Sequence, residues 1–344
     1  GSSGYLDDYT CGNNPYYFTF DLEPGDPFIF NNNFPVKANM DYGDLPAPYA
    51  TLKSQDGARH NATGTLYLGL VAPDVEIDGI PSSDSNSDDF NGVDDENGVS
   101  FLTPIAPGTT AQLSVDASAT GYLNAWMDFN GDGDFEDTGE QIATDKTLTV
   151  GANSLSVDPV PMSATGAIYS RFRFSSETGL SPIGVANDGE VEDYALGSIG
   201  DFVWDDVLNP NGKQDGEPGI NGVVVHLLDF NKDLIGITVT ADHPITGEPG
   251  WYEFPGLLPD FYYLKFILSG GYVFTMQNIG SDDEIDSDTN ETTGETDLIV
   301  VTAGTIITNI DCGMISGADL DYGDLPDSPY LTYHASDGAR HIID

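Results

Sequence analysis

The chain has 344 residues, a length that suggests two or three domains. It carries 57 acidic and 10 basic residues, and a formal charge of −47 repels nucleic acid and anionic membrane surfaces, so nucleic-acid binding is excluded. A hydrophobic content of 39%, with 11% aromatic residues, is too high for a solvated acidic tail and can fill folded cores. The 40 glycines and 21 prolines indicate many tight turns, so we expect an all-β protein.

The first 98 residues divide into an arm and a repeat-start segment. Residues 1–40 are rich in asparagine and aromatic residues, and the stretch YYFTFDL at residues 16–22 predicts a lone strand. Residues 41–98 contain the motif DYGDLPAPYATLKSQDGARH, a short apolar stretch LYLGLV and a very acidic loop. We call residues 41–98 the repeat-start segment.

Two β-sandwiches are predicted next, over residues 99–197 and 198–316. The stretch IYSRFRF at residues 168–174 alternates, with Tyr169, Arg171 and Arg173 on one face and apolar residues on the other. Turn dipeptides such as Asn130-Gly131 and Asn221-Gly222 separate such stretches at short intervals, which is typical of β-sandwiches. No amphipathic helix is expected. Further strands are expected at residues 112–116, 122–129, 222–229, 262–268 and 296–302.

Residues 317–344 begin a second copy of the repeat. The motif DYGDLPDSPYLTYHASDGARH at residues 321–341 repeats the motif at residues 41–60 with one inserted residue. A segment this short cannot bury a core of its own. We expect that either the chain is cut at the start of another unit or this segment docks elsewhere, for example near the strand at residues 16–22 of the next molecule.

The strongest chemical signal is the acidic stretch DFNGDGDFE at residues 128–136. Oxygen-bearing side chains occur at every second residue, with glycines where the chain must turn, and a calcium ion takes about six to eight such oxygen ligands. The twelfth position is Gly139 instead of glutamate, and strands are expected on both sides. We therefore predict a calcium loop without an EF-hand fold, against the alternative of a solvated acidic turn. The predicted ligands are Asp128, Asn130, Asp132, Asp134, Glu136 and Glu140.

Three further acidic clusters are candidate Ca2+ sites. Like charges this close repel each other unless cations neutralise them. For any one cluster, the alternative is a solvated acidic face that keeps the protein soluble. The first cluster comprises Asp84, Asp88, Asp89, Asn91, Asp94, Asp95 and Glu96, the second Asp206, Asn209, Asn211, Gln214, Asp215 and Glu217, and the third Asp282, Asp283, Asp286 and Asp288.

Several motifs resemble known bacterial domain families. The motif NDGEVEDYAL at residues 187–196, preceded by GYLNAWMDFNGDGDF and YSRFRFS, resembles the GEVED domain of large bacterial surface and secreted proteins. The motifs DYGDLP, DGARH, LYLG and DDFNGVDDENGV resemble the segment that commonly precedes this domain. The motifs IGDFVWDD, QDGEPGINGVVVHLLD, SDDEIDSD and TNIDCGM resemble the SdrD B-like domain, a calcium-binding stalk module of bacterial adhesins.

The resemblance implies Ig-like or Cna B-like sandwiches with Ca2+ as the cofactor. Most ligand positions of the SdrD B-like pattern are kept after Trp204, but Leu208 occupies the position of the first asparagine and Asn209 is shifted by one. Cys312 stands where the family has a core-facing residue, so we expect a buried free thiol. The alternative is a disulfide between Cys11 and Cys312 across a junction between molecules.

Catalytic motifs are poorly represented, and we do not expect an enzyme. No G-x-S-x-G, H-E-x-x-H or P-loop motif occurs. His60 recurs with the DGARH motif, where stabilising a turn is favoured over metal binding or base catalysis. Glu190 and Glu192 share a strand face as a glycosidase pair would, but such pairs arise by chance among 57 acidic residues. Arg171 or Arg173 is expected to pair with one of these glutamates.

The favoured function is a calcium-stiffened structural protein, extracellular or on the bacterial cell surface, that forms a stalk, surface layer or self-assembling filament. Its partner would be itself, in tandem or head-to-tail assembly. Direct membrane insertion is not expected, because no apolar stretch reaches the ~18–20 residues that span a bilayer. One alternative is an adhesin that binds a glycan or protein ligand, which a cluster of exposed aromatic residues would favour. Another is a set of accessory domains of a secreted hydrolase.

Overall fold

The computed structural model of the protein describes residues 40–87, 95–208, 210–268, 270–316, 320–322 and 340–342. All of them belong to one unit of the chain, Ala38–Asp344. The strand expected at residues 16–22 and residue Cys11 lie outside the described residues. Within the described ranges, no helix is both long enough and apolar enough to cross a membrane.

Strands form nearly all of the regular structure, which confirms the all-β fold class. Helical structure in the described ranges is limited to one 3-10 turn, η1 (Lys53–Gln55). Gly131 and Gly222, at two of the predicted turns, have φ angles of 70° and 85°. Only glycine adopts this left-handed backbone at little cost, so these residues let the chain reverse between strands.

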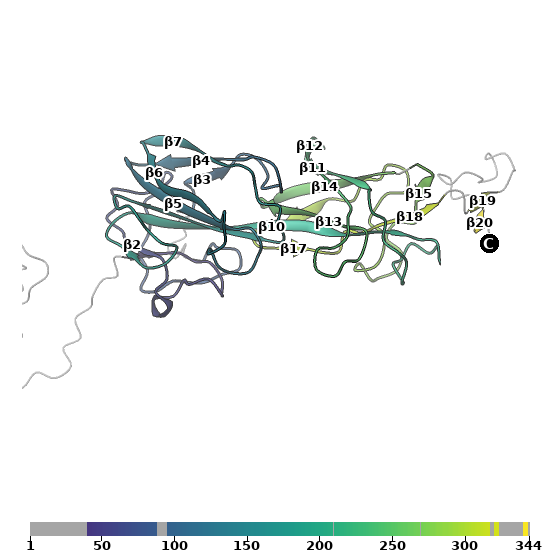
Figure 1. The fold of residues 1–344 in the computed structure, drawn as a ribbon, viewed down its shortest axis with the longest axis horizontal. Coiled ribbons are helices and arrows are strands. Elements are labelled where there is room, and N and C mark those ends of the chain that lie inside the picture. Colours follow the sequence, from purple (N-terminus) through teal and green to yellow (C-terminus); the bar gives the residue numbers. More distant parts are fainter. Residues whose placement is uncertain are drawn as a thin grey trace, which may run out of the picture. The chain divides into compact units, whose positions relative to one another are not determined.

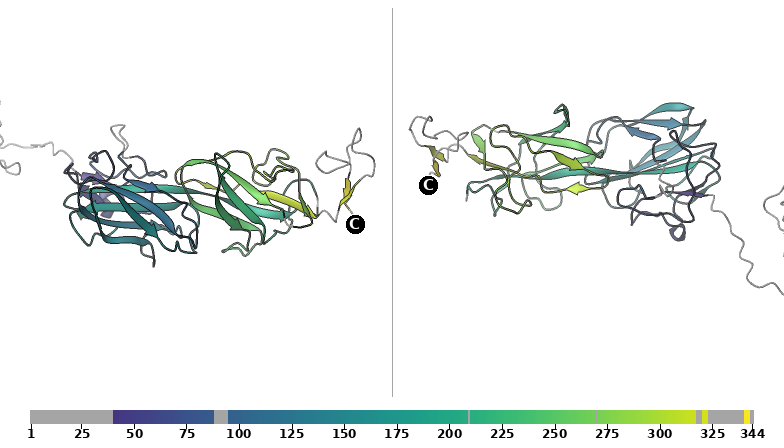
Figure 2. Two further views of the ribbon diagram at one scale, coloured as in Figure 1. Left: turned by 90° about the horizontal axis from the view of Figure 1, so that it is seen from above. Right: turned by 180° about the vertical axis from the view of Figure 1, so that it is seen from behind.

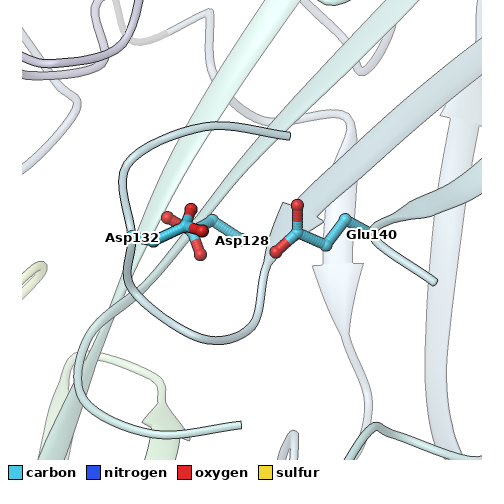
Figure 3. A group of neighbouring side chains, drawn as sticks. All are labelled: Asp128, Asp132 and Glu140. Carbon is cyan, nitrogen blue, oxygen red and sulfur yellow. The ribbon is translucent and has the colours of Figure 1, made fainter. Parts of the chain in front are cut away.

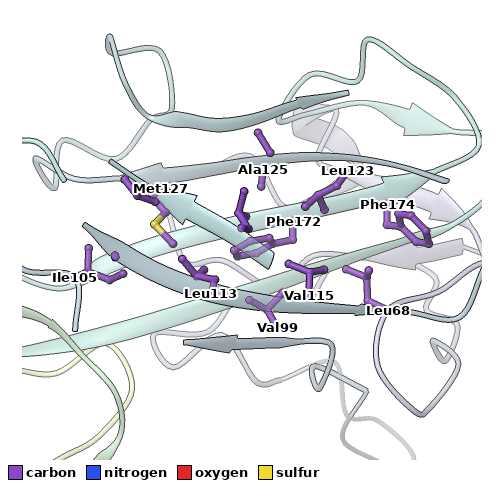
Figure 4. Packing of buried hydrophobic residues seen from close by; sticks show 14 of the residues in the cluster. Leu68, Val99, Ile105, Leu113, Val115, Leu123, Ala125, Met127, Phe172 and Phe174 are labelled. Carbon is purple, nitrogen blue, oxygen red and sulfur yellow. The ribbon is translucent and has the colours of Figure 1, made fainter. Parts of the chain in front are cut away.

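The first sandwich has two antiparallel layers around an apolar core. One layer has the order β3 (Val99–Phe101), β4 (Ala111–Ala117), β7 (Gly151–Val157). The other has the order β10 (Glu190–Asp205), β8 (Ile168–Ser175), β5 (Gly121–Asp128), β6 (Gln141–Leu148). Leu113 and Val115 of β4 share a fully buried core with Leu123 and Phe172 of the other layer (Figure 4). The alternation predicted for residues 168–174 is therefore confirmed.

The second sandwich also has two layers, but one of them contains parallel strand pairs (Figure 2). One layer has the order β12 (Leu234–Val239), β11 (Val224–Asp229), β14 (Asp260–Ile267), β16 (Ile299–Val301). In the other layer the later part of β10 pairs with β13 (Trp251–Leu257), β17 (Ile306–Ile307) and β18 (Cys312–Ser316), and β18 pairs with β15 (Tyr272–Phe274). Cys312 is a fully buried free thiol in this core, as predicted, and burial raises its pKa.

Strand β10 runs without interruption from one sandwich into the other (Figure 1). Residues 190–196 pair with β8, and residues 197–202 pair with β13. The predicted domain boundary between residues 197 and 198 falls inside this strand and stays a prediction. Glu253 of β13 accepts hydrogen bonds from the Thr165 hydroxyl at 2.7 Å and the Gly166 N–H at 2.6 Å, which joins residues of the two sandwiches beside β10.

The first residues of the repeat-start segment pack against the outer face of β8 and β10. Its strands β1 (Met40–Tyr42) and β2 (Arg59–Asn61) form a small sheet with β9 (Val185–Ala186). The carboxylate of Asp193 accepts hydrogen bonds from the N–H groups of Asp44 at 2.8 Å and Leu45 at 3.1 Å. This contact attaches the DYGDLP motif to the sheet.

Arg171 binds Asp193 in a buried, two-pronged ion pair, with N–O distances of 2.8 and 2.7 Å. The expected pairing of Arg171 or Arg173 with Glu190 or Glu192 is therefore wrong. Successive residues of a strand point to opposite faces, so Asp193 shares a face with the arginines while the two glutamates lie on the other. The arginine does bind a carboxylate of the neighbouring strand, as expected, but that carboxylate belongs to Asp193.

His60 has the structural role that the sequence favoured. Its Nδ1 lies 2.8 Å from the Asp188 carbonyl, so Nδ1–H donates and Nε2 accepts from Arg173 Nε at 3.0 Å. Burial and the charge of Arg173 lower the pKa of His60 well below its usual value. The neutral ring therefore acts as a spacer between a buried guanidinium and the backbone.

The second repeat copy pairs its ends in the same register as the first. In the first copy Asp41 lies opposite His60, and in the second Asp321 lies opposite His341. The second pair of strands comprises β19 (Leu320–Tyr322) and β20 (Arg340–Ile342). The two motifs thus specify the same local hairpin-like pairing.

We predict that Arg171→Met destabilises the protein strongly. The substitution leaves Asp193 buried without its partner, which typically costs about 3–5 kcal/mol of unfolding free energy. Chemical denaturation followed by circular dichroism would measure the loss. The matched control is Arg59→Met, whose ion pair with Asp56 is exposed on the aspartate side and should be worth less than about 1 kcal/mol. Equal small losses in both variants would contradict the prediction.

Candidate metal centres

The predicted calcium loop connects β5 to β6 and is built around Asp128. Its Oδ1 accepts the Gly131 N–H at 2.7 Å and its Oδ2 accepts the Gly133 N–H at 2.8 Å. Both glycines have positive φ angles, 70° and 91°, which lets the backbone wrap around the carboxylate. Tyr49 of the repeat-start segment donates its hydroxyl to Asp128 Oδ2 at 2.5 Å. The loop is therefore fixed from outside as well as from within.

Three carboxylates of this loop converge. Oxygen atoms of Asp128, Asp132 and Glu140 all lie within 4.8 Å of one another, in a position that could hold a metal ion (Figure 3). Asp128 and Glu140 are buried, whereas Asp132 is exposed. Burial, aided by the charges of Asp128 and Asp132, raises the pKa of Glu140 to about 7. Such mutual repulsion in a buried position fits a site that a cation would occupy.

The other predicted ligands of the loop lie outside this group. Asn130 donates its amide to Asp132 at 3.2 Å and to Asp137 at 2.6 Å. Asp134 and Glu136 are exposed, and the Asp134 carboxylate accepts the N–H of Glu136 at 2.8 Å. The structure therefore brings together the first, third and last of the predicted positions. The assignment of Asn130, Asp134 and Glu136 as ligands stays a prediction.

A second group of carboxylates lies in the loop between β15 and β16. Oxygen atoms of Asp283, Asp286 and Asp288 lie within 4.8 Å of one another, while Asp282 is exposed beside them. Oδ1 of Asp286 is buried and has no hydrogen-bond partner among the described residues. Burial, together with the charges of Asp283 and Asp286, raises the pKa of Asp288 to about 7. An orphaned carboxylate oxygen among like charges fits a cation site.

Sequence reasoning missed two aspartates that adjoin this second group. Asp311 is fully buried, and its N–H donates to Asp288 at 2.6 Å, while in the described part of the chain its Oδ2 has no hydrogen-bond partner. Burial and the charge of Asp201 raise the pKa of Asp311 to about 9. Both residues lie in motifs that were quoted for the resemblance, IGDFVWDD and TNIDCGM. Only the acidic clusters of the predicted loops were considered as ligands, so Asp201, which lies in β10, and Asp311, which directly precedes β18, were left out.

The Asp206 cluster is organised by hydrogen bonds. Asp206 Oδ2 accepts the Gly212 N–H at 2.9 Å and the hydroxyl of Thr275, and Asn211 donates to Asp215 at 3.2 Å. Glu217 accepts the Asp215 N–H at 2.8 Å, and its Oε1 is buried with no partner from the residues that the structure describes. Gln214 holds this loop to the third cluster through its N–H and the Ile285 carbonyl, 2.7 Å apart. Asn209 lies outside the described residues, and the cluster stays a predicted site.

The acidic loop of the repeat-start segment is described only at its ends. Asp84 is exposed, whereas Asp95 is buried and accepts the Asp74 N–H at 2.7 Å. Glu96 is half-buried. The predicted ligands that lie outside the described residues are Asp88, Asp89, Asn91 and Asp94.

Two family models match the chain where the motifs suggested. Residues 122–197 match the GEVED domain, and residues 197–314 match the SdrD B-like domain. Both resemblances drawn from the motifs are thereby confirmed. Residues 122–314 therefore resemble a GEVED domain followed directly by an SdrD B-like domain.

Curated relatives match a shorter stretch. The serine-aspartate repeat-containing protein C of Staphylococcus aureus, in strains Newman and USA300, is 44% identical over 99 residues. These residues are 28% of this chain and 10% of each relative, so the match spans about a tenth of the relatives' length.

Solved structures show only distant likeness. The Bacillus anthracis TIE protein is 12% identical with a TM-score of 0.22, and the match covers 63% of this chain and 41% of that one. The T6 backbone pilin of serotype M6 Streptococcus pyogenes is 11% identical with a TM-score of 0.23, covering 64% and 70%. The major pilin subunit BcpA of Bacillus cereus is 9% identical with a TM-score of 0.22, covering 62% and 69%. These low TM-scores carry no argument about this chain.

Without metal ions, we predict that Glu140 makes the protein less stable as pH rises. Its pKa is about 7 in the folded protein and about 4.3 in an unfolded chain, so the folded state binds more protons between these values. Stability must then fall as pH rises from about 4.5 to 7, with no further contribution from this group above that interval. Glu140→Gln should remove this part of the pH dependence.

The measurement is thermal unfolding in excess EDTA from pH 5 to pH 8. The matched control is Glu136→Gln, which alters an exposed residue of the same loop and should follow the unsubstituted protein. Identical pH profiles for the Glu140→Gln variant and the unsubstituted protein would contradict the prediction.

Proposed function

We propose that the chain is a non-enzymatic structural protein, extracellular or on the bacterial cell surface, whose fold is stiffened by bound Ca2+. The observation that carries this proposal is the convergence of Asp128, Asp132 and Glu140 in a partly buried loop site. The second group at Asp283, Asp286 and Asp288 supports it. The matches to the GEVED and SdrD B-like domains support a structural role at the bacterial surface.

The charge of the chain gives the ion a mechanical role. A protein with 57 acidic and 10 basic residues repels itself, and crowded carboxylates concentrate that repulsion in loops. Calcium suits such loops, because it accepts six to eight oxygen ligands in flexible geometry. At the first site Asp128, Asp132 and Glu140 would hold the ion and so close the β5–β6 loop. At the second, Asp286 and Asp288 would join their loop to Asp311 of the sandwich.

We expect calcium to raise the melting temperature by more than about 10 °C relative to excess EDTA, since an ion bound only by the folded state adds stability at every site. Differential scanning calorimetry would measure this difference, and an unchanged melting curve would contradict the proposal.

Isothermal titration calorimetry with calcium tests the first site by itself. Asp128→Ala and Asp132→Ala should each lose one bound ion without unfolding the second sandwich, whereas Glu248→Gln, an exposed residue outside the acidic clusters, should lose none.

Self-assembly is the second part of the proposal, and the repeat supports it. The first repeat copy covers the sheet face that carries Asp193 and Arg171. The second copy pairs its ends identically and would require an equivalent face. Either a following unit of the same polypeptide or a second molecule in head-to-tail contact would supply it.

Deletion of residues 321–344 tests this part. The deleted protein should bind calcium as before but remain monomeric, while the 344-residue chain associates in calcium at high concentration. Analytical ultracentrifugation with electron microscopy would compare the two proteins. Fibres from the deleted chain, or a strictly monomeric 344-residue chain, would rule out docking by this segment.

A second candidate function, an adhesin that binds a glycan, is favoured by one surface. Phe230 and Phe261 are 60% and 43% exposed, with ring centroids 6.0 Å apart. Beside them the Lys232 ammonium lies 4.6 Å from the centre of the Tyr263 ring. Exposed rings with a nearby cation can stack against sugars. Binding of the protein to a glycan array that Phe230→Ala and Phe261→Ala both abolish would favour this function, and absence of binding would leave the structural role.

A further inference from the structure

Asp128, the central residue of the first loop site, lies on the sheet face that binds the repeat-start segment. Asp128 of β5 is opposite Tyr169 of β8 in the antiparallel register, and Trp126 is opposite Arg171. Residues opposite each other share a face, and so do residues two apart in one strand. Asp128 therefore shares the face of Arg171, which donates to the Ala50 carbonyl of the segment at 3.0 Å. One face of the sheet thus carries both the loop ligand and the docked segment.

Residues 44–51 of the repeat-start segment, which we call the docking loop, are held in one conformation. The Thr51 hydroxyl donates to the Leu45 carbonyl at 2.7 Å, which closes the docking loop on itself. Asp193 accepts the Leu45 N–H at 3.1 Å, which fixes the beginning of the docking loop to the sheet. The side chain of Tyr49 near its other end is buried, with 6% of its surface exposed.

The docking loop contacts the calcium loop between β5 and β6 at several points. The Tyr49 hydroxyl donates to Asp128 Oδ2 at 2.5 Å. The Tyr49 ring stacks on that of Phe135, with centroids 5.2 Å apart and ring planes at 29°. Beside this pair, a Cβ atom at Gly133 would come within 2.2 Å of Pro48 Cγ, so the backbone of the calcium loop packs directly against the docking loop. The two loops therefore share a hydrogen bond, a ring pair and a close backbone contact.

The donors around Asp128 leave one of its oxygens open to a metal ion. Each carboxylate oxygen has about two lone-pair directions. Oδ2 uses two of them, for the Gly133 N–H at 2.8 Å and the Tyr49 hydroxyl. Oδ1 has one donor among the described residues, the Gly131 N–H at 2.7 Å. Outer partners such as this hydroxyl fix the orientation of a metal ligand, and their loss typically lowers metal affinity about 10- to 100-fold.

We propose that Tyr49 is a positioning residue of the first calcium site, so that calcium binding and docking of residues 44–51 on the sheet stabilise each other. The docking loop supplies the hydroxyl that orients Asp128. A bound ion would in turn hold the calcium loop in the form that Tyr49 contacts. Such coupling is reciprocal, so each event strengthens the other by the same factor. The inference rests on the proposed calcium site and states how that site is regulated.

The sequence of the second repeat copy keeps the residues that this contact needs. Pro329 and Tyr330 follow the DYGDLP motif as Pro48 and Tyr49 do in the first copy, with two residues before the proline in place of one. A second copy docked on an equivalent face of another unit would bring the same hydroxyl to the calcium loop of that unit. The partner that this face fits is therefore the repeat-start segment of a second copy, and calcium would strengthen the contact.

Calcium titration of the 344-residue chain by isothermal calorimetry tests the positioning role. Tyr49→Phe keeps the ring pair with Phe135 but removes the hydroxyl, so one calcium site should bind at least about tenfold more weakly. The matched control is Tyr169→Phe, because the Tyr169 hydroxyl donates to the Ser83 carbonyl at 3.1 Å. This control should bind calcium as the unsubstituted protein does. Unchanged calcium affinity in Tyr49→Phe would overturn the proposal.

A double variant separates the coupling from the calcium site itself. Asp128→Ala should lose the loop ion, and adding Tyr49→Phe should lower calcium affinity no further, because Tyr49 acts through Asp128. If Asp128→Ala loses its ion while Tyr49→Phe binds normally, the coupling is wrong and the proposed function stands. If Asp128→Ala keeps the full number of ions, the loop assignment is wrong and the coupling falls with it.

Hydrogen exchange of the unsubstituted protein gives a test that does not depend on a variant folding. Calcium should slow exchange of the Asp44 and Leu45 amides, which donate to Asp193, by at least about tenfold relative to EDTA. In Tyr49→Phe this calcium dependence should be lost. A tyrosine with a merely structural role would protect these amides equally with and without the ion. Protection that calcium does not change would overturn the proposal.

Discussion

Several carboxylates of this protein are buried, and few basic side chains are available to balance their charge. Most of the structure described above follows from that constraint. Where an arginine is present, as with Arg171 and Asp193, the carboxylate is clamped by two hydrogen bonds and also receives backbone N–H groups. Where no arginine is near, the carboxylates gather in small groups and their pKa values rise, as for Glu140 and Asp311. Buried charge is tolerated only with such compensation.

Strand β10 shows both solutions on its two faces. Asp193 faces the repeat-start segment and is neutralised by a guanidinium, whereas Glu190 and Glu192 face the core, where the donors that the described residues supply are backbone N–H groups and a hydroxyl. Alternation along a strand separates these environments by a single residue. The same alternation makes the strand intolerant of a register slip, since a shift by one residue would exchange the two sets of carboxylates.

Much of the fold could be predicted from the sequence, because its signals are local. Alternation in IYSRFRF identified a core-facing strand, and asparagine-glycine pairs identified turns. The site was harder to predict. The spacing of Asp128 and Asp132 marks a loop ligand set, but the burial of Glu140 depends on the whole β5–β6 connection. The partner of Arg171 was chosen wrongly because pairing across strands requires the register, and Asp311 was overlooked because its neighbours are distant in sequence.

The shared register of β1–β2 and β19–β20 bears on the length of the connection between the paired ends. The second repeat copy has one residue more than the first, yet Asp41 opposite His60 and Asp321 opposite His341 are equivalent pairs. The extra residue must therefore lie in the connection between the paired ends. Lengthening a connection costs little, because closure entropy grows only slowly with length. A connection of either length therefore leaves the register of the paired ends unchanged, so the length of this loop is not constrained by the pairing that the motif specifies.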